Sequence, residues 1–98
     1  MTEKQFNSLW LPIYWSDEKN MKLIQDRNIW FENVLIALEN NKLVSVISNP
    51  SKNHPHQDCL IINIDNYIYL VPFVEDDEKI FLKTIFASRK FTKYFLKN

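Results

Sequence analysis

Apolar residues follow two different spacings along the chain, and each spacing predicts its own kind of element. In the first half, Phe31, Val34, Leu35 and Leu38 stand at positions i, i+3, i+4 and i+7, which is the spacing of one helix face. We expect this helix to end at the two asparagines of 40–41, because asparagine tolerates the left-handed backbone that ends many helices.

A short helix is expected nearer the N-terminus. The β-type run Ile13–Trp15 comes first, and Ser16 or Asp17 can then cap a helix that carries Glu18 in its first turn. This N-terminal helix is only moderately amphipathic. The first part of the chain therefore predicts a short strand followed by two helices.

Strand-like segments fill the second half of the chain. They are rich in β-branched and aromatic residues and lie at 42–48, 59–64, 67–74 and 79–87, with a polar loop that contains two prolines after the first. Asp65 and Asn66 separate the second segment from the third, which predicts a two-residue hairpin turn. In that hairpin we expect three facing pairs: Ile64 with Tyr67, Ile62 with Tyr69 and Leu60 with Val71.

Both faces of this hairpin are apolar, because Ile61 and Ile68 point to the side opposite the three pairs. Each face therefore needs cover from another part of the chain. Pro72 lacks an N–H, so we expect its strand to be bulged there or to lack one partner. The last segment alternates as well, with Ile80, Leu82, Thr84 and Phe86 expected on one face and Phe81, Lys83 and Ile85 on the other.

A third helix is expected at the C-terminal end of the chain. Ser88 is a good N-cap, and Phe91, Tyr94 and Phe95 then share the helix face that we expect to pack on the sheet. The whole pattern predicts one small α+β domain, residues 1–98, in which two helices precede an antiparallel β-sheet meander and one helix follows it. A chain of 98 residues leaves no room for a second domain.

Composition narrows the possible function classes. The chain has no glycine, which argues against a glycine-rich phosphate loop or a dinucleotide-binding fingerprint. Its single cysteine, Cys59, cannot form a disulfide within the chain and is expected in a buried strand. No apolar run approaches the roughly 20 residues that span a bilayer, and the start lacks the pattern of a signal peptide. We therefore expect a cytoplasmic protein without membrane contact.

Charge is distributed unevenly although 12 basic and 12 acidic residues cancel. From position 79 onward there is no acidic residue, and the basic residues are Lys79, Lys83, Arg89, Lys90, Lys93 and Lys97. This final segment is formally +6, so the preceding chain is −6. Such asymmetry indicates a polyanionic partner.

Several segments occur in an order and at a spacing that resemble a known family. They are "NIWFENVLIALENNKLVSVISNP", "YLVPFVEDDE", "FLKTI" and "SRK", and together they resemble the BrnT-like family of bacterial type II toxins from about Tyr14 to the C-terminus. Two features depart from the family pattern. Trp30 stands where relatives commonly have a serine helix cap, and residues 1–12 form an N-terminal extension.

The resemblance implies a RelE-like ribonuclease fold and an endoribonuclease that inhibits translation and growth without a metal or other cofactor. The substrate would be RNA, either free or on ribosomes. The resemblance also implies a cognate antitoxin with a DNA-binding part, often of the ribbon-helix-helix type. Contact with DNA is then expected only through the antitoxin.

Metal-independent RNA cleavage needs a base for the 2′-hydroxyl, cations for the phosphate and an acid for the leaving oxygen. Four residues are candidates for this catalysis: Lys83, Arg89, Lys90 and Glu75. Five more are candidates for RNA binding: Lys93, Lys97, Tyr94, His54 and His56. Two cations at the start of the last helix favour a phosphate site, since they are otherwise unfavourable to the helix dipole.

Each candidate also has an ordinary structural explanation. Lys83 could be an edge lysine that reaches water, and Tyr94 is expected to pack on the sheet more readily than to contact RNA. The acidic turn 75–78 could be a solvated hairpin tip or a docking point for a basic antitoxin segment. The two histidines have no carboxylate partner at a fixed spacing and are too few to predict a metal site.

Two other functions fit the same sequence. One is a catalytically inactive toxin relative that binds an antitoxin as a co-repressor. The other is a module that holds RNA or DNA phosphates without chemistry, through binding that weakens steeply with salt. Cleaved product, and not affinity, distinguishes catalysis from both.

Overall fold

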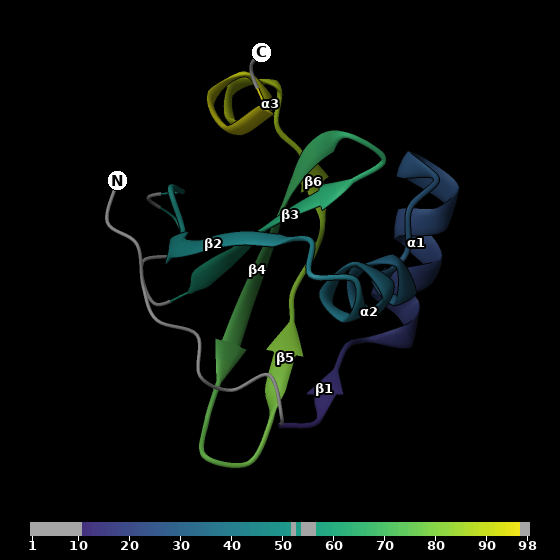
Figure 1. The fold of residues 1–98 in the computed structure, drawn as a ribbon. Helices are drawn as coiled ribbons and strands as arrows, with labels where there is room; N and C mark the ends of the chain where they lie inside the picture. Colours follow the sequence, from purple (N-terminus) through teal and green to yellow (C-terminus); the bar gives the residue numbers. More distant parts are fainter. Residues whose placement is uncertain (1–10, 52, 54–56, 97–98) are drawn as a thin grey trace.

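The computed structural model describes residues 11–51, 53 and 57–96, which form three helices and a six-stranded sheet (Figure 1). In chain order the elements are β1 (Ile13–Tyr14), α1 (Asp17–Arg27), α2 (Phe31–Glu39), β2 (Leu43–Ser48), β3 (Asp58–Ile64), β4 (Tyr67–Glu75), β5 (Ile80–Leu82), β6 (Phe86–Ala87) and α3 (Arg89–Leu96). The predicted α+β class is confirmed. So is the order of two helices, a meander and a final helix, with one difference in the last strand.

The sheet is mixed. Its strand order is β1-β5-β4-β3-β2, and β6 pairs with β4 beyond the end of β5. All neighbours from β2 to β5 are antiparallel, as the predicted meander requires. The short β1 adds a parallel edge strand, with Ile13 beside Ile80 and Tyr14 beside Phe81.

The β3–β4 hairpin has the predicted turn and the predicted register. Ile64 faces Tyr67, Ile62 faces Tyr69 and Leu60 faces Val71. Asp65 and Asn66 both adopt positive φ, at 52° and 65°. Two left-handed residues in a two-residue loop match the right-handed twist of the strands, which is why this turn holds the register.

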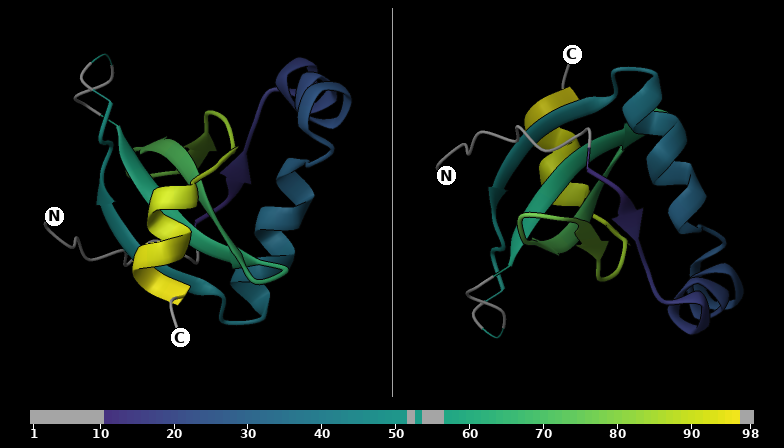
Figure 2. Two further views of the ribbon diagram at one scale, coloured as in Figure 1. Left: turned by 90° about the horizontal axis from the view of Figure 1, so that it is seen from above. Right: turned by 90° about the horizontal axis from the view of Figure 1, so that it is seen from below.

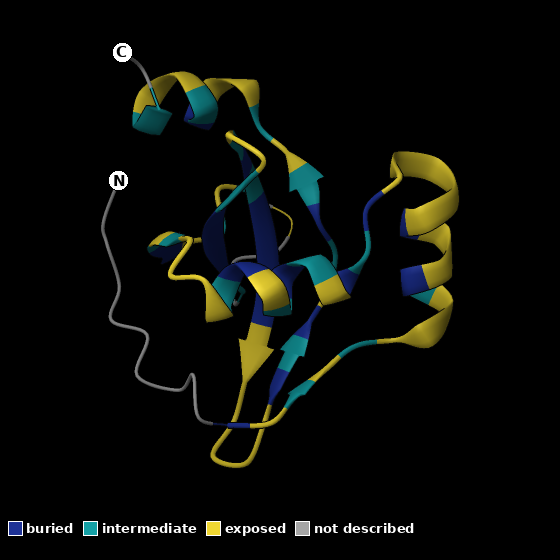
Figure 3. Cartoon of the chain, turned by 45° about the vertical axis from the view of Figure 1, so that its right-hand side comes forward, coloured by how far each residue is buried: buried dark blue, intermediate teal, exposed yellow. Residues whose placement is uncertain are grey.

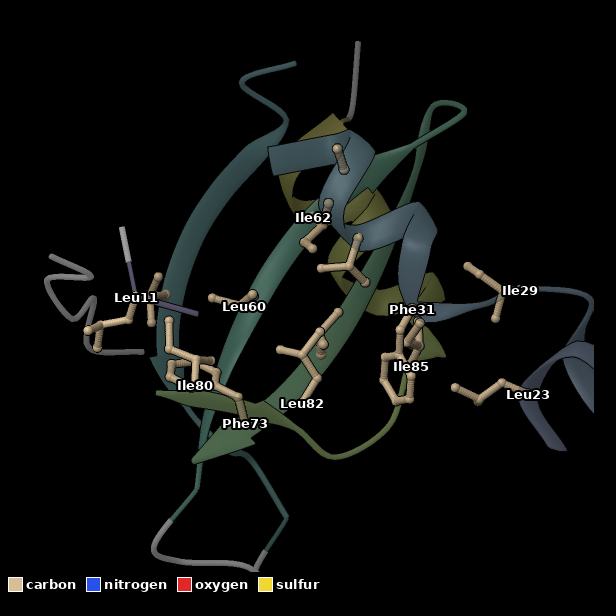
Figure 4. Close-up of a cluster of buried hydrophobic side chains, with 14 residues drawn as sticks. Leu11, Leu23, Ile29, Phe31, Leu60, Ile62, Phe73, Ile80, Leu82 and Ile85 are labelled. Atoms are coloured by element: carbon tan, nitrogen blue, oxygen red, sulfur yellow. The ribbon is translucent and has the colours of Figure 1, made fainter. Parts of the chain in front are cut away.

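Each face of the sheet is covered by a helix, as the two apolar faces of the hairpin predict. On one face, Phe31 and Val34 of α2 pack against Leu60, Ile62 and the strands around them (Figure 4). On the other face, Phe91 of α3 packs in a second cluster; its other buried members are Ile47, Cys59, Ile61, Ile68 and Leu70. Figure 2 shows α3 in front of the sheet in one view and behind it in the other. We call these sides the α2 face and the α3 face.

The two N-terminal helices begin at polar side chains. Of the two predicted caps, Ser16 is the one that caps α1, because its hydroxyl accepts a hydrogen bond of 3.1 Å from the Lys19 N–H. The helix α2 begins after Trp30, and two N–H groups at its start are satisfied by Asn20 of α1 and by Asn33 of its own first turn. The Phe31 N–H donates to Asn20 Oδ1 at 2.8 Å, and the Trp30 N–H donates to Asn33 Oδ1 at 2.9 Å. These two acceptors serve in place of a capping side chain at position 30.

The continuous last strand that alternation predicts is wrong, because it is interrupted after Leu82. The ladder with β4 stops at the pair Phe73–Leu82 and resumes at Leu70–Phe86, so two residues of β4 oppose three of the other strand. The extra residue reverses the alternation: Ile85 joins Leu82 in the α2-face core, and Phe86 packs on the α3 face. We call residues 83–85 the bulge.

The bulge lies opposite Pro72, where the missing N–H predicts a bulge or a missing partner. The second alternative is found, because no residue of β5 or β6 pairs with Pro72, while the extra residue lies in the neighbouring strand. Across the bulge, the Lys83 N–H donates to the Pro72 carbonyl at 2.8 Å. Among the described residues, no helix is long and apolar enough to cross a membrane.

Candidate functional site

A half-open cavity of about 350 Å³ with both polar and apolar lining residues lies beside the bulge. Its lining residues are Lys19, Asn49, Ser51, Gln57, Pro72, Lys83, Thr84 and Phe86. The cavity lies on the α3 face, because Phe86 packs there and Pro72 follows Leu70 by two residues on one strand. It is assembled from α1, the ends of β2 and β3, and the bulge.

Lys83 is the predicted catalytic residue that lines this cavity. Its side chain is exposed, and Nζ lies 5.2 Å from the centroid of the Phe81 ring. The neighbours expected from strict alternation are partly wrong, since Ile85 turns into the core of the opposite face. Lys83 keeps the face that alternation predicts for it, opposite Pro72, and Lys83 as a phosphate contact stays a prediction.

Arg27 supports the bulge from a distance in the sequence. Its guanidinium donates from Nη1 to the carbonyl oxygen of Ile85, which joins the last turn of α1 to the bulge. Sequence reasoning missed Arg27, and no local signal indicates it, because the contact spans 58 positions of the chain.

The cations of α3 form a second part of the site. Arg89, Lys90 and Lys93 are all exposed, as the predicted solvent side of this helix requires. Ser88 caps the helix as predicted, with its hydroxyl accepting from the Phe91 N–H at 3.0 Å. The expectation that Tyr94 packs on the sheet is wrong, because its side chain is 64% exposed. Phe91 and Phe95 fill that place instead, and RNA contact by Tyr94 stays a prediction.

The start of α3 and the cavity lie along the same stretch of β4. The Ser88 N–H donates to the Ile68 carbonyl, and the Lys83 N–H donates to the Pro72 carbonyl. These anchors are four positions apart on β4, which is roughly 13 Å at the usual rise per residue. One extended polyanion can therefore contact both parts.

Glu75 is not brought to the cavity. It is exposed at the end of β4 and, by alternation from Phe73, its side chain projects from the α2 face. Figure 3 shows that the tip of the β4–β5 hairpin is exposed throughout. The neighbouring residue Asp76 stabilises this tip, because its carboxylate accepts hydrogen bonds from the Glu78 and Lys79 N–H groups. These two bonds lower the pKa of Asp76.

Three predicted site residues, His54, His56 and Lys97, lie outside the described residues. The chain neighbours Ser51 and Gln57, on either side of the two histidines, line the cavity. Within the part of the chain that the structure describes, no group of three or more His, Cys, Asp or Glu side chains could hold a metal ion.

Comparisons of the chain with models of protein families, with curated proteins and with solved structures find no match.

Proposed function

We propose that this protein is the toxin of a type II toxin–antitoxin system, a metal-independent endoribonuclease that resembles the BrnT-like toxins and the RelE-like ribonucleases. The observation that carries the proposal is the collection of cations along the α3 face. Lys19 and Lys83 line the cavity there, and α3 exposes Arg89, Lys90 and Lys93 next to it. A concave and basic surface of this kind suits the phosphates of single-stranded RNA.

The proposed chemistry is attack of the RNA 2′-oxygen on the neighbouring phosphorus. The new P–O bond forms a 2′,3′-cyclic phosphate, and the bond to the 5′-oxygen breaks to leave a 5′-hydroxyl. Lys83 and Arg89 stabilise the negative charge that builds up on the phosphate oxygens. One proton leaves the 2′-oxygen and one reaches the 5′-oxygen, and His54 and His56 are the candidates for these transfers because histidine titrates near neutral pH.

We propose a cognate antitoxin with a DNA-binding part as the protein partner, and the cytoplasm as the place of action. The antitoxin would cover the basic face and keep the toxin inactive, since a partner with acidic groups complements the surplus positive charge there. DNA would be reached only through the antitoxin.

Growth and RNA integrity on induction of the chain in bacterial cells test this proposal. We expect growth arrest with fragmented RNA for the wild type. Both effects should be absent for Arg89→Ala and on co-expression with the neighbouring open reading frame. Lys22→Ala is the matched control, because Lys22 is an exposed lysine of α1 outside the cavity. Normal growth and intact RNA from a folded, well-expressed wild type would favour an inactive binding module.

A further inference from the structure

Three side-chain oxygens at the cavity, those of Asn49, Ser51 and Gln57, each accept a hydrogen bond within the protein. Asn49 Oδ1 accepts from the Ser51 N–H at 3.0 Å, and Gln57 Oε1 accepts from Asn49 Nδ2 at 3.2 Å. Ser51 Oγ accepts from the Asn53 N–H at 3.3 Å. These hydrogen bonds join the residues between β2 and β3 that border the cavity.

The groups that remain in the cavity are donors. Gln57 accepts through Oε1, and its Nε2 is a further donor at the cavity. Lys19 and Lys83 each add an ammonium group, and no acidic side chain is among the described residues that line the cavity. The free hydrogen-bonding capacity is thus strongly biased toward an acceptor ligand.

Thr84 supplies a second and independent indication. Its Oγ1 is buried and has no hydrogen-bond partner among the described residues. A buried hydroxyl without a partner costs stability, so such groups are rare unless a bound molecule satisfies them. Thr84 is a lining residue of the cavity next to Lys83, and its hydroxyl lies within the cavity wall.

We infer that the cavity is a preformed phosphate site in which Lys19, Lys83, Gln57 and Thr84 bind one phosphodiester of the RNA. The identity of the ligand as RNA rests on the proposed function, whereas the preference for a phosphate rests on the donors alone. A volume of about 350 Å³ falls in the usual range for small-ligand sites and admits a phosphate with its attached sugar. Thr84 is a binding residue here, and Arg27 is a positioning residue that holds the bulge.

Inorganic phosphate is the probe for the test, titrated at constant ionic strength while the backbone amides of the labelled protein are followed by NMR. We expect saturable shifts at Lys19, Gln57 and residues 83–86. Thr84→Val should weaken the binding about tenfold, since a hydrogen bond to a charged group is lost, and Thr84→Ser should restore most of it. Lys19→Met and Lys83→Met should also weaken it, while Lys22→Met on the same helix should change it by less than about twofold.

A stability measurement separates a ligand-binding role of Thr84 from a structural one. If the hydroxyl serves only the ligand, Thr84→Val keeps the shape and removes an unpaired polar atom, so the free protein unfolds at the same or a higher urea concentration. Wild-type phosphate affinity in Thr84→Val, or unfolding of that variant at a lower urea concentration, would overturn the assignment of the hydroxyl to a ligand. Absence of saturable binding to the wild type would overturn the site.

An uncleavable single-stranded RNA with 2′-O-methyl groups tests whether the phosphate belongs to RNA. We expect this RNA to shift the same amides as phosphate and to bind Thr84→Val more weakly. RNA binding that leaves these amides unmoved would overturn RNA as the source of the phosphate. Saturable phosphate binding without any cleavage of ordinary RNA would support the phosphate site and contradict the proposed endoribonuclease activity.

Discussion

Asn20 joins the two N-terminal helices through hydrogen bonds of its side-chain amide. It is the buried polar residue among the described side chains, with 9% of its surface exposed. Oδ1 accepts from the Phe31 N–H, and Nδ2 donates to Glu32 Oε1 at 2.9 Å. One amide side chain therefore satisfies the first turn of α2 from the middle of α1.

Replacing Asn20 with alanine should destabilise the fold by about 1–3 kcal/mol, because the buried Phe31 N–H loses its acceptor. Urea unfolding followed by circular dichroism measures the change. Gln25→Ala on the exposed side of α1 is the control and should stay within about 0.5 kcal/mol of the wild type. Equal stability of the two variants would contradict the role given to Asn20.

Cys59 makes a prediction about pH. Burial, together with the negative charge of Asp58, raises the pKa of the thiol from 9.0 to about 12. In the unfolded chain the thiol ionises above its ordinary pKa, while in the folded protein it stays neutral up to about 12. The unfolded state therefore binds fewer protons across this window, and stability falls as pH rises, by up to about 1.4 kcal/mol per pH unit from this group.

Cys59→Ala isolates that contribution, because every other titrating group remains in both proteins. We expect the variant to lose stability less steeply than the wild type above pH 9.0, although the removed sulfur lowers its stability at neutral pH. Urea unfolding at a series of pH values gives the two slopes. Parallel slopes would mean that the folded thiol ionises normally.

At the scale of elements, Thr92 attaches α3 to the sheet. Its Oγ1 accepts from the Ile68 N–H at 2.9 Å and donates to the Ser88 carbonyl at 2.7 Å. The strand β4 is thus joined by a hydrogen bond to the helix that carries the basic residues. The orientation of these cations depends on this attachment.

Thr92→Val should cost about 1–3 kcal/mol, because the Ile68 N–H loses its acceptor while the side-chain shape is kept. Amide hydrogen exchange should rise at Ile68 and along α3 more than in β3. Thr92→Ser keeps the hydroxyl and should exchange like the wild type. Faster exchange spread evenly over the sheet would show that the hydroxyl does not hold the helix in particular.

The elements that depend on local signals were predictable from the sequence. Asp65 and Asn66 mark the hairpin turn, and the turn sets the register of β3 on β4. The interruption after Leu82 was not predictable from its own segment, which alternates without a break. The interruption lies opposite Pro72, which has no N–H to donate to the neighbouring strand. The hydrogen bond from Arg27 to the Ile85 carbonyl, which supports the bulge, comes from α1.

The candidate site was predictable in part, for the same physical reason. Charge alone points to Lys83 and to the cations of α3, because no acidic residue accompanies them in the sequence. Lys19, Gln57 and Thr84 carry no signal of their own, since they meet at the cavity only after the chain has folded. Tyr94 shows the limit of a helical pattern, because Phe91 and Phe95 suffice to cover the sheet.

For the whole molecule, the separation of charge predicts how RNA binding responds to salt. Contacts from Lys83, Arg89, Lys90 and Lys93 to single-stranded RNA should give a slope of about −3 in a plot of log affinity against log salt concentration. Lys93→Ala should reduce the slope by roughly 0.7, while Lys22→Ala should leave it unchanged. Fluorescence anisotropy with the 2′-O-methyl RNA measures both, and a slope near zero would exclude binding through these cations.

Cleavage of RNA by the purified chain tests the central proposal most directly. The wild type, Arg89→Ala and Lys22→Ala, each shown to be folded, are incubated with a defined single-stranded RNA in the presence of EDTA, and the ends of the products are mapped. We predict fragments with 2′,3′-cyclic phosphate and 5′-hydroxyl ends from the wild type and Lys22→Ala, and little or none from Arg89→Ala. Intact RNA from all three proteins, or equal cleavage by Arg89→Ala, would contradict an endoribonuclease site on the α3 face.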